Sequence, residues 1–126
     1  MLITTPAARR RRTETPNAVM TTLASPTLGA SSDLSLWQVE MEAGACGPVH
    51  TFDSEQLWTV LEGAIRARVE GDESDLMEGD TLVLPAGAMR QIVARATTRL
   101  LVCGRGDAIV RVDGEDLPRG TPEWIA

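Results

Sequence analysis

His50, Gln56 and Arg90 are the residues of this chain whose types could act together on a small molecule. An imidazole can accept or donate a proton near neutral pH, and a primary amide can hydrogen-bond a carbonyl or hydroxyl group. A guanidinium group pairs with a carboxylate, a phenolate or an enolate. Together these three groups would suit an oxygenated organic molecule, including an anionic one.

Two glycine-anchored segments hold these residues at defined spacings. The first runs Gly44, five residues, His50-Thr51-Phe52, three residues, Gln56, six residues, Gly63. The second begins after a further fifteen residues and runs Gly79, five residues, Pro85-Ala86-Gly87, two residues, Arg90. Glycine and proline at such points are typical of tight turns at strand ends. In these two motifs the chain resembles a small single-domain cupin, of the cupin-2 or RmlC-like jelly-roll type, and the layout extends over about residues 17–113.

The resemblance implies a metal site that is degenerate in this chain. Cupin metal centres generally take two histidines and a glutamate from the first motif and one histidine from the second, and these positions hold His50, Phe52, Gln56 and Arg90. Phe52 has no donor atom, Gln56 offers a neutral amide oxygen, and Arg90 is a permanent cation that repels a divalent ion. We therefore expect no metal and no other cofactor.

A divalent metal bound through His50 in a rebuilt site is the alternative. Its further ligands would have to come from Asp53, Glu55 or Cys103. Along a strand, however, the even-numbered residues from 50 to 60 share one face, so Asp53 and Glu55 should point the other way.

The same alternation predicts an apolar pocket around the polar groups. We expect His50 to be the catalytic acid or base, and Gln56 and Arg90 to bind substrate. The wall of the pocket is expected to include Trp37, Met41, Phe52, Trp58 and Ile92. An inward arginine is costly unless it is paired, and the sequence leaves open whether the partner is a carboxylate, such as Glu40 or Glu55, or a ligand anion.

Short apolar segments separated by turn signals must position these residues. They cover residues 19–23, 34–41, 57–61, 65–69, 81–84, 90–94, 100–103 and 109–112, while Glu70 to Asp75 is interpreted as an acidic turn. No segment of ten or more residues has a helical period, which favours an all-β antiparallel barrel or jelly roll. We expect residues 1–16 to be a flexible N-terminal arm and residues 17–126 to be a single cupin barrel, with the last seven residues clamping one edge.

Composition excludes several classes of function. The 126-residue chain has a formal charge of −6, and four of its twelve basic residues lie in the run Arg9 to Arg12, so no nucleic-acid partner is expected. It has neither lysine nor tyrosine, which excludes Schiff-base and tyrosine acid catalysis.

No apolar run approaches the roughly 20 residues that span a bilayer, and no signal-peptide stretch is evident, so we expect a cytoplasmic protein with no membrane partner. Cupins commonly pair their sheets, and the resemblance therefore implies a homodimer.

Three functions remain open at this point. The first is a metal-independent cupin that binds a small organic molecule and catalyses its isomerisation, cyclisation or proton transfer. The second is a metal-dependent cupin enzyme, similar to dioxygenase-like or polyketide-cyclase-like members, with a rebuilt site. The third is a non-catalytic ligand sensor or structural cupin. The fold does not choose among them, because function depends on the site.

Overall fold

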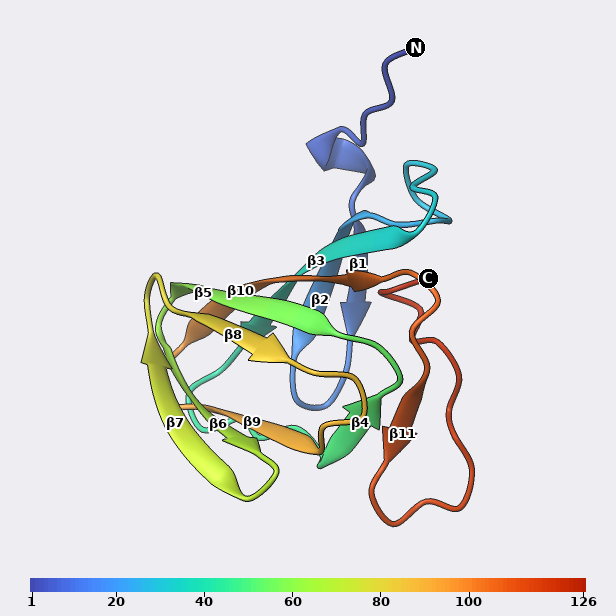
Figure 1. The fold of residues 1–126 in the computed structure, drawn as a ribbon. Coiled ribbons are helices and arrows are strands. Elements are labelled where there is room, and N and C mark those ends of the chain that lie inside the picture. The colour runs from blue at the N-terminus through green and yellow to red at the C-terminus, as the bar shows by residue number, and fades with distance from the viewer.

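Two antiparallel sheets face each other across one core in a computed structural model that describes residues 1–126. One sheet has six strands in the order β1-β2-β3-β10-β5-β8, and the other has five in the order β11-β4-β9-β6-β7. The strands are β1 (Arg11–Glu14), β2 (Val19–Ala24), β3 (Leu34–Met41), β4 (His50–Phe52), β5 (Gln56–Glu62), β6 (Ala64–Val69), β7 (Asp72–Met77), β8 (Thr81–Leu84), β9 (Arg90–Ala94), β10 (Thr98–Arg105) and β11 (Val110–Val112). In Figure 1 the six-stranded sheet lies above the five-stranded one.

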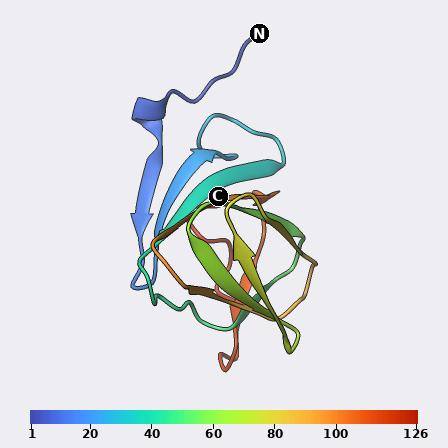
Figure 2. The same cartoon turned by 90° about the vertical axis from the view of Figure 1, so that its left-hand side faces the viewer.

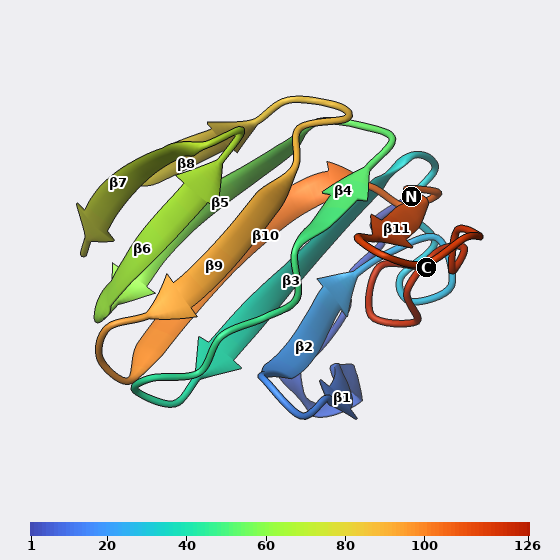
Figure 3. The ribbon, with the colours of Figure 1, turned by 90° about the horizontal axis from the view of Figure 1, so that it is seen from below.

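The predicted all-β jelly roll is confirmed. The only helical element is one turn of 3-10 helix, Ala7–Arg9, and every strand pairing is antiparallel. Figure 3 shows β6, β9 and β4 side by side in the five-stranded sheet, with β5, β10 and β3 behind them. No helix is long and apolar enough to cross a membrane.

Period-two alternation places the core where the sequence predicts it. In β3 the side chains of Trp37, Val39 and Met41 are buried, while their neighbours are exposed or half-buried. In β5, Trp58 and Val60 are buried in the same way. These inward faces pack against the inward face of the other sheet and form one cluster of seventeen buried apolar residues.

Three strands lie outside the predicted set, and each lacks an apolar alternation. β1 lies within the segment expected to be a flexible arm, and it pairs with β2 at the edge of the six-stranded sheet (Figure 2). β4 has only three residues. β7 covers most of the expected acidic turn, which in fact is confined to Glu70 and Gly71. Only Leu76 of β7 is buried, so its other residues carry no pattern that distinguishes a strand from a turn.

The C-terminal residues pack against β2 and the turn that follows it, one strand in from the edge of the six-stranded sheet. Thr22 Oγ1 donates to the Trp124 carbonyl oxygen at 2.6 Å, and Ser25 Oγ donates to that of Ala126 at 2.8 Å. Ile125 is fully buried. These contacts bring the last residues beside β2.

Gly63 joins β5 to β6 and provides a test of the turn geometry. Its φ of +88° is left-handed, and a Cβ there would lie 2.8 Å from Thr98 Cα and even closer to the Thr97 carbonyl oxygen. We expect Gly63→Ala to lower the free energy of unfolding by more than about 2 kcal/mol, because steric overlap adds to the backbone strain. Urea unfolding measures this loss.

Gly71→Ala is the matched control for that substitution. Gly71 also has a left-handed φ, of +84°, but open space surrounds its Cβ position. We expect this change to cost about 1 kcal/mol, the strain contribution alone. Equal losses for the two variants would contradict the close approach of Thr97 and Thr98 to Gly63.

Candidate functional site

The loop before β4 is fastened to β9 and thereby positions His50. Backbone hydrogen bonds join Gly44 N to Ala94 O at 2.9 Å, Ala94 N to Ala45 O at 2.9 Å and Gly47 N to Ile92 O at 3.2 Å. Gly44 has a φ of +87°, which suits glycine at the turn. The loop therefore delivers its last residues to a fixed place beside β9.

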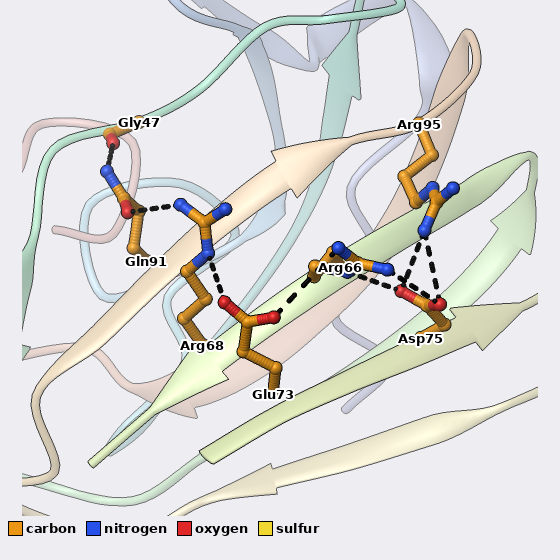
Figure 4. Close-up of polar contacts among 7 residues, drawn as sticks. All are labelled: Gly47, Arg66, Arg68, Glu73, Asp75, Gln91 and Arg95. Atoms are coloured by element: carbon orange, nitrogen blue, oxygen red, sulfur yellow. Dashed lines mark hydrogen bonds and ion pairs between the residues drawn. The ribbon is translucent and has the colours of Figure 1, made fainter. Parts of the chain in front are cut away.

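A side-chain network on the outer face of the five-stranded sheet adds to this anchorage (Figure 4). Gln91 Nε2 donates to the Gly47 carbonyl oxygen at 3.1 Å, and Gln91 Oε1 accepts from Arg68 Nη1 at 3.2 Å. Arg68 also pairs with Glu73, at 2.9 Å. The exposed ion pair contributes little by itself, but Gln91 is half-buried and ties the loop to the sheet.

His50 has one ring nitrogen engaged and the other free. Its Nδ1 lies 2.8 Å from the Pro48 carbonyl oxygen, which can only accept, so Nδ1 carries the proton. Burial lowers the pKa of His50 below its usual 6.5; the hydrogen bond to Pro48 opposes this shift, and the positive charge of Arg90 adds to it. The imidazole is therefore neutral near pH 7, with Nε2 available as a proton acceptor.

Gln56 is fully buried, and two donors fix its orientation. Its Oε1 accepts from Arg90 Nη1 at 2.8 Å and from Trp58 Nε1 at 3.1 Å. The amide nitrogen Nε2 is buried and has no hydrogen-bond partner in the protein. Because the oxygen is held by Arg90 and Trp58, Nε2 cannot exchange places with it without losing both bonds.

Arg90 is the only charged residue among the buried ones, with 1% of its surface exposed. Its guanidinium carbon lies 5.0 Å from the centre of the Phe52 ring, a cation–π distance. Its Nε and Nη2 atoms are buried without partners. Burial lowers the pKa of Arg90 to about 10, so the group keeps its charge near pH 7.

The carboxylates that the sequence suggested as partners for Arg90 lie at the protein surface, away from its buried guanidinium. Glu40 and Glu55 are both exposed, and neither forms an ion pair with Arg90. Gln56 is its only side-chain hydrogen-bond partner. Asp53 is also exposed, as the alternation predicts, and its Oδ1 accepts from the Ile109 backbone N–H at 2.8 Å.

A cavity of about 830 Å³ lies inside the barrel beside these groups. Its volume is in the range of small-molecule sites, and its wall is mostly apolar. Of the predicted site residues, it is lined by His50, Gln56, Phe52, Trp58, Trp37, Met41 and Ile92. Arg90 is not part of the lining: it contacts Gln56 and Phe52, which do line the cavity.

The rim of the cavity contains residues that the sequence analysis missed. Residues 15–18, between β1 and β2, lie on one side, and Val110, Arg119, Pro122 and Trp124 come from the C-terminal part of the chain. Apart from Val110, which lies in the predicted segment 109–112, these residues are in irregular segments, so periodicity could not assign them to a face. Pro122 and Trp124 were the only signal in the tail, and they indicated a clamp rather than a cavity wall.

The donor atoms present do not fit the metal that the cupin resemblance implies. Of the four positions only His50 has a strong metal-binding donor, and the guanidinium of Arg90 lies beside the others as a cation. No group of three or more His, Cys, Asp or Glu side chains anywhere in the chain could hold a metal ion.

Comparisons with known proteins identify the fold. Residues 37–104 match the family model described as a cupin domain. The structure is similar to KdgF from Halomonas sp., with a TM-score of 0.71 and 21% identity over 83% of this chain and 94% of that one. It is also similar to an RmlC-like cupin from Shewanella frigidimarina, with a TM-score of 0.69 and 19% identity over 81% and 88% of the two chains. A sugar phosphate isomerase of the cupin superfamily from Silicibacter pomeroyi has a TM-score of 0.64 and 24% identity over 79% and 68%. No curated protein matches the sequence.

The protonation of His50 can be measured directly because it is the only histidine. We expect NMR titration of its ring protons to give a midpoint below 6.5, since burial disfavours the charged ring. The unfolded chain then binds more protons than the folded one at mildly acid pH. The stabilising contribution of neutral His50 is present above pH 6.5 and is lost as the pH falls through the lowered midpoint.

Arg90→Met should raise that midpoint, because the repulsion between the guanidinium and the protonated ring is removed. Arg99→Met is the control, since Arg99 pairs with Glu62 at the surface. It should leave the midpoint unchanged. A wild-type midpoint at or above 6.5 would contradict the burial of His50.

Proposed function

Since the chain belongs to the cupin family, we propose that its barrel binds a small, mostly apolar organic molecule and moves a proton on it without a metal ion. The similar structures are too distant in sequence to assign a reaction, because one fold serves many chemistries. The proposal therefore rests on the site itself. Its main support is that two polar atoms without partners, His50 Nε2 and Gln56 Nε2, belong to residues that line a mostly apolar cavity.

The two atoms have complementary roles. Gln56 Nε2 is a donor, and it suits a carbonyl or hydroxyl oxygen of the bound molecule. His50 Nε2 is an acceptor on a neutral ring, and it suits the removal of a proton from a carbon next to that carbonyl. The apolar wall would then hold the molecule so that its reacting carbon lies beside His50 Nε2.

The reaction that follows is an enolisation. The C–H bond breaks, the proton passes to His50 Nε2, and the electron pair moves to the carbonyl oxygen. Gln56 stabilises the resulting enolate by its hydrogen bond, and the positive charge of Arg90 stabilises it across the Gln56 amide. Return of the proton to the same carbon gives exchange; where the molecule has a β,γ double bond, the intermediate is a dienolate, and return of the proton to its γ-carbon completes an isomerisation.

Cyclohexanone is a simple probe of this chemistry, because it has an apolar ring and one carbonyl group. We expect it to quench the fluorescence of the three tryptophans, all of which line the cavity. In D2O the protein should accelerate the exchange of its α-protons, followed by NMR. His50→Gln should reduce the acceleration by about two orders of magnitude or more, with the dissociation constant changed less than about threefold.

Arg99→Met, at the surface, serves again as the control and should exchange like the wild type. Exchange in the presence of the wild type at the rate of the buffer alone, with binding retained, would support the non-catalytic ligand-binding function instead. Equal acceleration by wild type and His50→Gln would contradict the role of His50 as the base. Absence of binding by this probe and its ring-substituted analogues would argue against the small-molecule site.

Metal independence is tested by rebuilding the missing ligands. The triple variant Phe52→His, Gln56→Glu, Arg90→His restores the donor types that the family motifs imply, so it should bind Co²⁺ with a visible absorption band. The wild type should bind none, and EDTA should not change its melting temperature. About one tightly bound metal ion per wild-type chain, measured on the purified protein, would contradict the proposal.

A further inference from the structure

Arg90 differs from the paired arginines of this chain in having no counter-charge. Seven arginines form ion pairs with Asp or Glu, and all of them have side chains at least 37% exposed. Arg90 is buried and forms none. A charge removed from water is normally paired, so a buried cation without a carboxylate is an unusual arrangement.

The groups around Arg90 are neutral. It touches the Gln56 amide and the Phe52 ring, and it faces His50 across the β4–β9 pair. His50 is held in its neutral form. The Arg90 Nε and Nη2 and the Gln56 Nε2 are all donors, and none has an acceptor in the protein. This cluster therefore has unused donors and an uncompensated positive charge.

The cavity beside the cluster contains no acid. The chain has eighteen Asp and Glu residues and a net charge of −6, yet none of the acidic side chains lines the cavity. The only charged lining residue, Arg119, is paired with Glu115. The positive charge behind the wall is thus not offset by any acidic side chain of the cavity.

Gln56 connects the charge to the cavity. Its oxygen accepts from the guanidinium, and its nitrogen belongs to a residue of the cavity wall. A hydrogen bond from a cation polarises the amide and makes its N–H a stronger donor. Arg90 can therefore favour a negative group without touching it.

We propose that this cavity selects anionic ligands, namely molecules that carry a carboxylate on an apolar body, and that Arg90 exerts the selection through Gln56. This inference rests on the proposed small-molecule site and specifies its ligand class. Arg90 is a positioning residue in this scheme: it orients Gln56 and supplies the field, while Gln56 makes the contact.

A matched pair of probes separates charge from shape. Cyclohexanecarboxylate and cyclohexanecarboxamide have nearly the same size, and neither absorbs where tryptophan emits. Each is titrated at pH 7.5 and constant ionic strength, with tryptophan fluorescence and calorimetry as readouts. We expect the carboxylate to bind about tenfold more tightly than the amide, or better, as a charge-assisted hydrogen bond would give.

Variants at Arg90 and Gln56 test the cause of that preference. Arg90→Met should abolish it, so that the ratio of the two dissociation constants falls to about one, and Arg99→Met should retain it. Gln56→Glu is the second variant, in case Arg90→Met does not fold, because a carboxylate beside Arg90 neutralises the charge and leaves the arginine in place. It too should lose the preference.

The outcomes distinguish the two proposals. Equal binding of both probes to the wild type, or tighter binding of the amide, overturns anion selection and leaves the small-molecule site intact. A preference that persists in both Arg90→Met and Gln56→Glu overturns the role of Arg90. If neither probe binds, the small-molecule site is overturned, and the inference with it.

Discussion

The hydrogen bond from the Arg90 guanidinium to the Gln56 side-chain oxygen is the interaction on which the interior of this barrel depends. It joins β9 of one sheet to β5 of the other, deep between them. A buried cation is tolerated only where its surroundings are polarisable, and here an amide oxygen and the face of Phe52 meet that need in part. Because the Gln56 amide and the Phe52 ring are both neutral, they stabilise the positive charge of Arg90 but do not cancel it. A glutamate at position 56 would form an ion pair with Arg90. The positive charge beside the cavity would then be neutralised.

His50 shows how a local backbone arrangement sets chemical character. The Pro48 carbonyl oxygen fixes which ring nitrogen holds the proton, and the loop that presents this oxygen is fastened to β9 by backbone bonds and by Gln91. Burial is the main reason that the pKa of the ring is lowered, and the nearby charge of Arg90 adds to it. Two elements distant in sequence, the loop before β4 and the first residue of β9, therefore act on one imidazole. The glycines of the motif matter because they allow that loop its shape.

The sequence was sufficient to predict which side chains of the regular strands point inward. It was insufficient to predict how far each of them lies from the cavity. Alternation assigned Trp37, Met41 and Trp58 to the interior, and all three line the cavity. The same reasoning assigned Arg90 to the interior but could not say that Gln56 and Phe52 would stand between it and the cavity, because parity fixes a direction and not a distance. The rim residues escaped prediction for another reason. Irregular segments have no period, and contacts such as that of Thr22 with the Trp124 carbonyl hold the tail in place.

The acidic strand β7 has a consequence for the behaviour of the protein in concentrated solution. It is the outer strand of the five-stranded sheet, so its free backbone groups could template a strand from another molecule. Its exposed Asp72, Glu73 and Asp75 make that approach unfavourable for a second copy, whose own β7 would bring the same charges. The arginines of β6 hold two of these carboxylates along the strand. The acidic residues of β7 thus disfavour aggregation through the edge of this sheet.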